Sequence, residues 1–221
     1  MIDHGAMQQC MRDRLFTLSV CSTGSTTLAA TTAGYTRTTG SFITDGFAVG
    51  MELFASGFAK AANNGRKTIT DVTDTLISCD GCVADVATIG RTLFVGIPAG
   101  RAMENMFYEP VSPAPWLEEQ YIPGPQYLGG ISEFARISVE PQYAIRIHVK
   151  EYTSTRAAHA YATALLNLFP PALVLTALPN GDVLKVRADL GPFRGQLLPS
   201  RPGFVVVPVT IPFRLHSINL V

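Results

Sequence analysis

The chain has 221 residues, of which 47% are hydrophobic and 15% charged, with 17 basic side chains balancing 17 acidic ones. The charged fraction lies below the roughly 25% usual for soluble domains, so we expect a core together with surfaces that become buried against other chains. A formal net charge of zero removes the basic face that phosphate-driven nucleic-acid binding requires, and direct binding to DNA or RNA is not expected.

Neither a membrane span nor a disulfide framework is expected. The longest apolar runs, such as Phe204–Val207, fall far short of the roughly 18 residues that cross a bilayer. The start, Met1–His4, lacks the basic flank and apolar stretch of a signal peptide. The four cysteines are too few and too unevenly spaced to staple a small secreted domain, which favours synthesis inside a cell with reduced thiols. They are Cys10, Cys21, Cys79 and Cys82.

Residues 1–16 predict a short amphipathic helix, because their apolar side chains recur on one helical stripe. The stripe consists of Ile2, Met7, Cys10, Met11 and Leu15. Residues 17–95 then lack proline and are rich in Thr, Gly and Ser, which predicts a small all-β unit of short strands and tight turns. Within it, Asn63-Asn64-Gly65 predicts a hairpin between residues 53–58 and 68–72.

Residues 98–109 predict a second helix that ends before Pro110. A proline-rich segment follows through Pro125 and carries the only tryptophan, Trp116. Its missing amide donors argue against a central strand but leave short extended pieces open. A loop of this length is expected to lie on a partner.

The rest of the chain predicts two strands, a helix, a hairpin and a last strand. The strands are 134–139 and 143–150, and in the second Tyr143, Ile145, Ile147 and Val149 alternate with more polar residues, predicting one dry and one wet face. Residues 155–169 predict a helix stopped by two prolines, and 173–178 with 183–188 predict a hairpin. In the final segment, 204–215, Pro208 and Pro212 predict an edge or broken strand.

Metal or redox chemistry has one candidate motif, Cys79-Asp80-Gly81-Cys82. Two cysteines at this spacing form half of a zinc knuckle or a redox pair. The second half is missing, and the histidines are scattered, so we favour a cysteine-flanked β-turn and expect no metal. The histidines are His4, His148, His159 and His216.

No enzyme signature emerges, and no cofactor is expected. His159 has no nucleophile beside it at a recognisable turn and is interpreted as a polar-face residue. Glu118 and Glu119 are adjacent in sequence, so their side chains are expected to point apart rather than flank one glycosidic bond. No glycine-rich phosphate-binding pattern is present in the sequence.

The order of these elements resembles that of the tail terminator proteins of long-tailed bacteriophages. The resemblance rests on the helix, the proline-rich stretch with Trp116, the strand pair ending in Tyr143–Val149, the helix 155–169, the hairpin around Asn180-Gly181 and the closing strand 205–213. Residues 17–95 resemble small β-domains of phage virion proteins through segments 40–51, 56–58 and 63–65 and Leu76.

The resemblance implies an α+β domain, 1–16 and 96–221, with a mixed or antiparallel sheet and flanking helices, plus an inserted all-β domain, 17–95, of sandwich or barrel type. It implies a non-enzymatic virion protein of the tail neck, assembled in the host cytoplasm. Six copies would form a ring that caps the tail tube and contacts the head-tail connector. The chain departs from the family by roughly eighty extra residues after the first helix.

Three aromatic residues are the candidate interface anchors, because aromatic side chains dominate interface hot spots. They are Trp116, Tyr121 and Tyr127, and packing within their own domain is the alternative. Alternatives for the whole chain are a tail-tube or head-completion subunit, and a glycan-binding β-module formed by the Thr- and Gly-rich residues.

Overall fold

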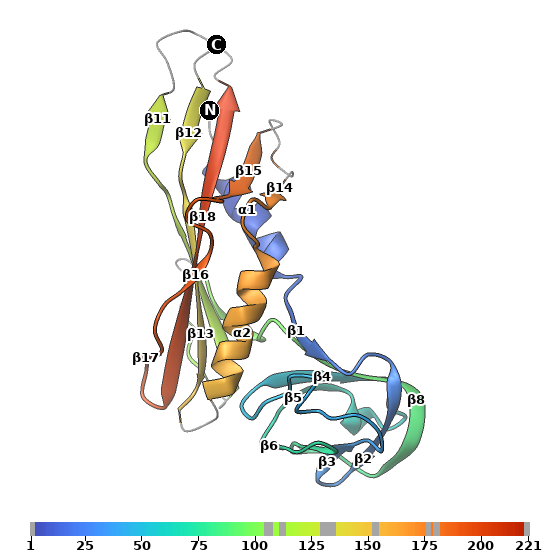
Figure 1. Ribbon diagram of the computed structural model, residues 1–221. Helices are drawn as coiled ribbons and strands as arrows, with labels where there is room; N and C mark the ends of the chain where they lie inside the picture. The colour runs from blue at the N-terminus through green and yellow to red at the C-terminus, as the bar shows by residue number, and fades with distance from the viewer. Residues whose placement is uncertain are drawn as a thin grey trace.

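The computed structural model describes residues 3–103, 108–110, 114–128, 136–151, 155–175, 178 and 182–218. Within these ranges the chain is mostly β-sheet with two helices, which agrees with the α+β class. Figure 1 shows an elongated larger sheet with both helices along one face, and a smaller, rounder group of strands near one end of it.

The larger sheet is built around one long strand, β18 (Phe204–Ile218). Its hydrogen-bonded path runs β11-β12-β18-β13-β10-β9, while β15, β16 and β17 also pair with β18, and β14 pairs with β15. The other strands are β9 (Gly100–Ala102), β10 (Trp116–Ile122), β11 (Gln126–Leu128), β12 (Arg136–Val139), β13 (Gln142–Lys150), β14 (Val174–Leu175), β15 (Val183–Val186), β16 (Phe193–Arg194) and β17 (Leu198–Pro199).

The position of β18 corrects the expectation of an edge or broken strand. Its N-terminal part pairs continuously with β13, and it also pairs with the short strands β15, β16 and β17. The carbonyl of Pro208 accepts from the Gly195 N–H (2.8 Å), and that of Pro212 accepts from the Arg187 N–H (2.9 Å). Because the N and O of one residue point to the same side of a strand, both prolines turn their missing donor away from β13. The ladder with β13 therefore stays intact.

Strand β10 corrects a second expectation, because the segment around Trp116 is an internal strand. It lies between β13, antiparallel, and β9, parallel. Pro115 and Pro123 flank the strand without entering it. Prolines that bracket a strand remove no donor from its ladder, which is why proline-rich flanks are compatible with an internal position.

The helix predicted over 98–109 is wrong at Gly100–Ala102, which form strand β9 beside Trp116–Glu118. Glycine weakens a helix. A Cβ at Gly100 would also lie 2.3 Å from the Tyr108 hydroxyl. Tertiary pairing with β10 therefore overrides the helical pattern. Residues 104–107 lie outside the described ranges.

The helices predicted over residues 1–16 and 155–169 are confirmed. Helix α1 (His4–Leu15) is capped by Asp3, whose carboxylate accepts from the Ala6 N–H, and it buries the predicted stripe at Met7, Cys10, Met11 and Leu15. Helix α2 (Thr155–Leu168) buries Ala157, Ala158, Tyr161, Ala162 and Leu165. It packs on β13 and β18 and also contacts α1 and β1.

The second face of β13 is drier than expected. Tyr143, Ile145, Ile147 and Val149 are buried toward the core as predicted. On the face expected to be wet, His148 is also buried, because the Trp116 ring covers it. A residue of the neighbouring strand β10 thus covers this face of β13, and the alternating pattern of residues 143–150 does not predict that.

The smaller sheet is formed by strands from residues 19–96, in the path β5-β4-β8-β2-β3-β7-β6, with β1 also pairing with β8. A short 3-10 helix, η1 (Ala61–Asn63), precedes β5. The strands are β1 (Ser19–Ser22), β2 (Thr26–Thr31), β3 (Gly34–Thr36), β4 (Glu52–Ser56), β5 (Gly65–Thr68), β6 (Asp71–Val72), β7 (Leu76–Ser78) and β8 (Asp85–Gly96).

The turn predicted at Asn63-Asn64-Gly65 joins the antiparallel pair β4 and β5, but the second strand is Gly65–Thr68 rather than the predicted 68–72. Gly65 has a φ of +94°, and the Asn64 side chain bonds the backbone of Phe58 at both its N–H and its carbonyl. The sequence thus places at this turn a glycine, which adopts positive φ freely, and an asparagine, whose side-chain amide caps the turn.

Most of the buried apolar side chains of both sheets and both helices form one cluster. Arg156 of α2 donates to the Ile43 carbonyl (2.7 Å), and Glu52 of β4 accepts from the Ala99 N–H (2.8 Å). The smaller sheet is therefore attached to the larger one by packing and by polar contacts.

Candidate functional site

Trp116 begins β10 and is 2% exposed. Its indole stacks on the His148 imidazole, with centroids 3.6 Å apart and planes 7° from parallel, and Phe204 meets the indole edge-on. Arg201 lies over the indole at 5.6 Å. All of these contacts lie within one chain. Trp116 therefore packs inside its own subunit, which is the alternative to a role as an interface anchor.

His148 is held neutral by this environment. Burial lowers its pKa from 6.5 to about 4, with Arg146 and Arg201 acting in the same direction and Glu118 opposing them. Its Nδ1 lies 2.7 Å from the Ser200 hydroxyl and its Nε2 lies 3.4 Å from Glu118. At neutral pH the imidazole stacks as an uncharged ring.

Glu118 and Glu119 point to opposite faces of β10, as predicted for adjacent residues of a strand. Glu118 pairs with Arg146 (2.9 Å) at a partly exposed position. Glu119 is buried and accepts from Arg12 Nε (2.6 Å) and from the Tyr143 hydroxyl. The two carboxylates thus have separate partners, and no single bond can lie between them.

The Glu119 cluster joins α1 to the larger sheet. Arg12 comes from the helix, and Tyr143 comes from β13. Burial and the Glu119 carboxylate raise the pKa of Tyr143, so the phenol stays protonated and donates. A charged and a neutral donor on one buried carboxylate stabilise this helix–sheet contact.

Tyr121, two residues further along β10, is 7% exposed and lies with its hydroxyl 2.6 Å from His4 Nδ1. Like Trp116 it packs within the chain. Tyr127 differs, because it is 52% exposed on β11. In the described part of the chain β11 pairs with β12 alone. Of the three candidate anchors, Tyr127 is therefore the one that offers free surface.

An ion-pair network lies close to Tyr127. Glu140 binds Arg187 (2.7 Å) and Arg214 (2.7 Å), and Asp189 also pairs with Arg187. The Asp189 hydrogen bonds raise the pKa of Arg187, and Arg187 holds the pKa of Asp189 below its usual range. Tyr127 is among the groups that act electrostatically on Arg187.

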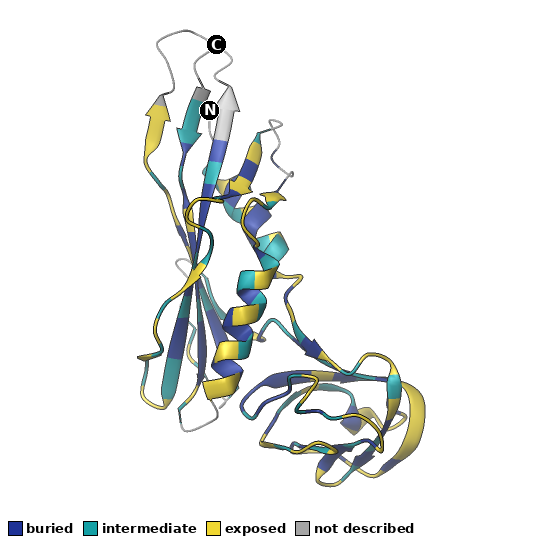
Figure 2. Ribbon diagram, in the orientation of Figure 1, coloured by how far each residue is buried: buried dark blue, intermediate teal, exposed yellow. Residues whose placement is uncertain are grey.

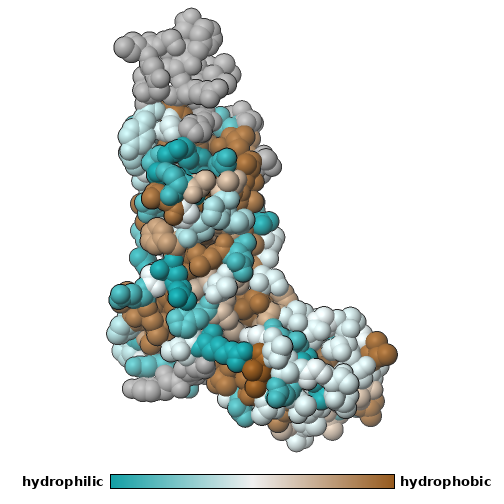
Figure 3. All heavy atoms as spheres, viewed as in Figure 1, coloured by the Kyte–Doolittle hydropathy of each residue, from teal (hydrophilic) through white to brown (hydrophobic). Residues whose placement is uncertain are grey.

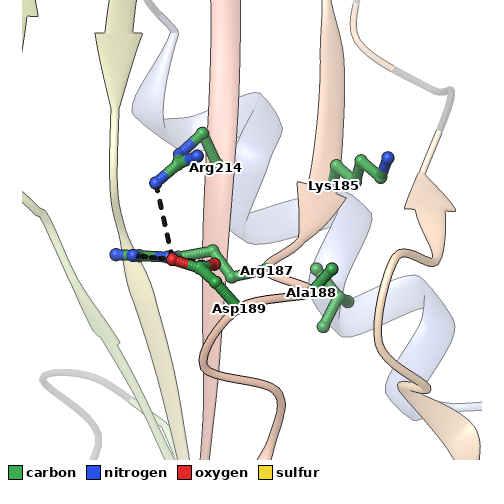
Figure 4. Close-up of a pocket in the computed structure, with 6 residues that line it drawn as sticks. Lys185, Arg187, Ala188, Asp189 and Arg214 are labelled. Atoms are coloured by element: carbon green, nitrogen blue, oxygen red, sulfur yellow. Dashed lines mark hydrogen bonds and ion pairs between the residues drawn. The ribbon is translucent and has the colours of Figure 1, made fainter.

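A surface pocket of about 390 Å³ opens beside this network. Figure 4 shows Arg187 and Asp189 side by side with Arg214 above them, and Lys185 set apart on β15. Most of the charged side chains around the pocket already form ion pairs with one another. Such a surface suits a polar protein contact better than capture of a small anion. The grouping of Glu140 with Arg214 depends on how the strands pair, so the local sequence does not predict it.

Sequence reasoning missed one exposed apolar surface. Val86 and Ile89 of β8 are 79% and 76% exposed, and Figure 2 shows this outer bend of β8 as exposed. In Figure 3 hydrophobic side chains gather at the same end of the smaller group of strands. Asp85 and Arg91, which form a buried ion pair (2.9 Å), bracket the exposed stretch. Alternation within residues 85–96 could not indicate which side faces solvent.

The motif Cys79-Asp80-Gly81-Cys82 forms a turn after β7, as predicted. Its two thiols are buried and lie 3.4 Å apart. Among the described residues no group of three metal-ligating side chains occurs. His159 lies on the exposed side of α2, with Nδ1 3.1 Å from Arg194. Within the same ranges no helix has the length and apolar character needed to cross a bilayer.

Comparison with known proteins gives no functional assignment. No family model matches the chain, and no curated protein matches it. A solved structure whose name states no activity is similar at 19% identity, with a TM-score of 0.42, over 52% of this chain and 78% of that one. A likeness this weak carries no argument about function.

Proposed function

We propose that this chain is a phage tail terminator subunit, which closes into a six-membered ring on the end of the tail tube and contacts the head-tail connector. It would act in the virion neck after assembly in the host cytoplasm, by shape and without catalysis. Three elements of the family resemblance support this proposal: the strand over Tyr143–Val149, the helix over 155–168 and the long closing strand.

The observation that carries the proposal is the half-exposed Tyr127 on the outermost strand β11. An outer strand leaves a row of unpaired backbone N–H and C=O groups, which another chain can pair with. The other end of the sheet path is β9, so the two ends present different surfaces. A head-to-tail contact that joins unlike surfaces closes into a ring when its rotation closes.

We further propose that residues 17–95 are an inserted β-domain. Ser19 of β1 lies opposite Gly96 of β8, so the chain enters and leaves this segment side by side. Such an entry and exit permits insertion between two consecutive elements of a parent fold. The exposed Val86 and Ile89 would then lie on the part of the subunit that the family lacks.

The ring is tested on the purified full-length chain by light scattering after gel filtration and by negative-stain microscopy. We expect closed single rings, and Tyr127→Glu should reduce them to monomers whose far-UV circular dichroism spectrum matches that of the wild type. Phe193→Glu on β16 is the matched control, because Phe193 is also 52% exposed. It should leave the rings intact.

Other outcomes have definite meanings. Open-ended stacks of rings would favour the tail-tube alternative, because a tube subunit polymerises and a terminator stops. A monomer at all concentrations, alone and with tube protein, would contradict the proposal. Loss of rings in both variants would show that Tyr127 has no special place in the contact.

A further inference from the structure

The turn after β7 places two thiols in contact. The sulfur atoms of Cys79 and Cys82 lie 3.4 Å apart, and the residues are 3% and 6% exposed. A disulfide requires an S–S separation of about 2.05 Å. Closing the remaining gap calls for small side-chain rotations in a turn whose sulfurs already face each other.

The backbone on both sides of the turn is anchored. The Cys79 N–H donates to the Ala33 carbonyl (3.2 Å). Just past Cys82, the Val83 N–H donates to Asn63 Oδ1 (2.8 Å), and the Asn63 amide donates back to the Val83 carbonyl (3.0 Å). The entropy of bringing the two sulfurs together has thus been lost on folding, which favours their reaction with each other.

The centre of the turn is fixed as well. Lys67 Nζ donates to the carbonyls of Asp80 and Gly81, both at 3.2 Å. Gly81 has a φ of +72°, a conformation that glycine adopts without strain. The lysine holds the turn in the form that keeps the two thiols on its inner side.

We propose that Cys79 and Cys82 form a redox-active dithiol, which a water-sized peroxide converts into an intramolecular disulfide. The thiolate of one cysteine attacks a peroxide oxygen, the O–O bond breaks, and a sulfenic acid and hydroxide form. The second sulfur then attacks the sulfenic sulfur and releases the oxygen as water. In total two thiols and one hydrogen peroxide give one disulfide and two water molecules.

The surroundings favour this chemistry over metal binding. Among the described residues no third His, Cys, Asp or Glu completes a metal site with the two thiols. Tyr35, which faces the pair, donates its hydroxyl to the Asn63 carbonyl (2.6 Å), and its pKa is raised by burial and by both cysteines. It therefore remains a neutral neighbour.

The environment also sets the rate. Burial raises the pKa of Cys79, with Cys82 and Asp80 acting in the same direction and Lys67 opposing them. Because the thiolate is the reactive form, oxidation is slow at neutral pH and accelerates as the pH rises. The thiols therefore persist in a reducing cell and close after transfer to oxidising surroundings.

The test uses the folded full-length chain treated with hydrogen peroxide at several pH values. Remaining thiols are alkylated after denaturation, and the peptides are weighed. We expect two of the four thiols to be lost, a peptide containing residues 79–82 that is two hydrogens lighter, and full recovery with a reductant. Cys82→Ser should abolish this disulfide, and the double variant Cys10→Ser/Cys21→Ser should retain it.

The proposal is overturned if all four thiols survive, if Cys79 or Cys82 passes to sulfinic acid without a disulfide, or if the disulfide joins another pair. Faster oxidation at lower pH would equally contradict it. The thiol count is independent of ring formation, so this proposal and the ring proposal fail separately.

Discussion

The indole of Trp116 lies flat on the imidazole of His148, with ring centroids 3.6 Å apart. The two residues are direct partners in the β10–β13 register. Cross-strand aromatic pairs stabilise a sheet. Here the contact also removes the imidazole from water, and this burial lowers the pKa of His148.

This burial predicts a pH dependence of stability. The pKa of His148 is about 4 in the folded chain, against 6.5 for the free side chain. Above pH 6.5 both states are neutral and the effect is absent. As the pH falls from 6.5 toward 4, the unfolded chain binds a proton that the folded chain excludes, so the free energy of unfolding decreases by up to about 1.4 kcal/mol per pH unit.

The measurement is urea unfolding between pH 7.5 and 4 for the wild type and for His148→Gln, whose side chain does not titrate. The wild type should lose more stability than the variant, and the difference should widen steadily as the pH falls from 6.5 toward 4. Parallel curves for the two proteins would show that His148 is protonated in the folded chain as readily as in the unfolded one.

The buried carboxylate of Glu119 predicts a large mutational effect. In Glu119→Gln the charge-assisted bond from Arg12 and the bond from Tyr143 are both weakened at a position whose side chain is 3% exposed. Breaking such a cluster costs about 2–4 kcal/mol. Urea unfolding at pH 7 measures it.

Glu118→Gln is the matched control for this change, because it makes the same substitution on the same strand. Glu118 and its partner Arg146 are each more than one third exposed, and such surface pairs contribute about 0–1 kcal/mol. Equal losses in the two variants would refute the assignment of a stabilising role to the Glu119 cluster.

The sequence correctly predicted the helices and hairpins whose structure is determined by residues within the segment itself. The stripe at Met7, Cys10, Met11 and Leu15 indicates α1, and the Asn63-Asn64-Gly65 turn indicates the β4–β5 hairpin, because period and turn chemistry are contained within each segment. The pairing of 173–178 with 183–188 is likewise confirmed by β14 and β15.

The predictions failed where pairing with strands distant in sequence determines the secondary structure. Pro208 and Pro212 are tolerated in a central strand because both turn toward the short strands and away from β13. Gly100 lies in a strand because β10 pairs with it. The candidate site shows the same limit: exposed Tyr127 cannot be distinguished in sequence from buried Trp116 and Tyr121 without the sheet order.

The Glu140 network predicts a salt-dependent effect. Glu140→Gln leaves Arg187 and Arg214 with only the more exposed Asp189 carboxylate beside them. We therefore expect a lower thermal midpoint and a smaller difference from the wild type at high salt, where charges are screened. Asp189→Asn, at a position with a 55% exposed side chain, should change the midpoint less. A larger effect of Asp189→Asn would indicate that Asp189, not Glu140, organises the two arginines.

Gly34, at the start of β3, predicts a severe loss of stability on substitution. Its φ is +141°, and a Cβ there would lie 2.0 Å from the Ile77 carbonyl oxygen, which belongs to the neighbouring strand β7. Gly34→Ala must therefore separate β3 from β7 and strain the backbone, at a cost of about 3 kcal/mol or more. Gly24→Ala shows what a φ of +64° costs without a steric clash, because no atom lies within 4 Å of the Gly24 Cβ position. It should cost about 1–2 kcal/mol. If urea unfolding gives the two variants the same loss, the close approach of β7 to Gly34 does not constrain this position, and the left-handed backbone alone explains the glycine.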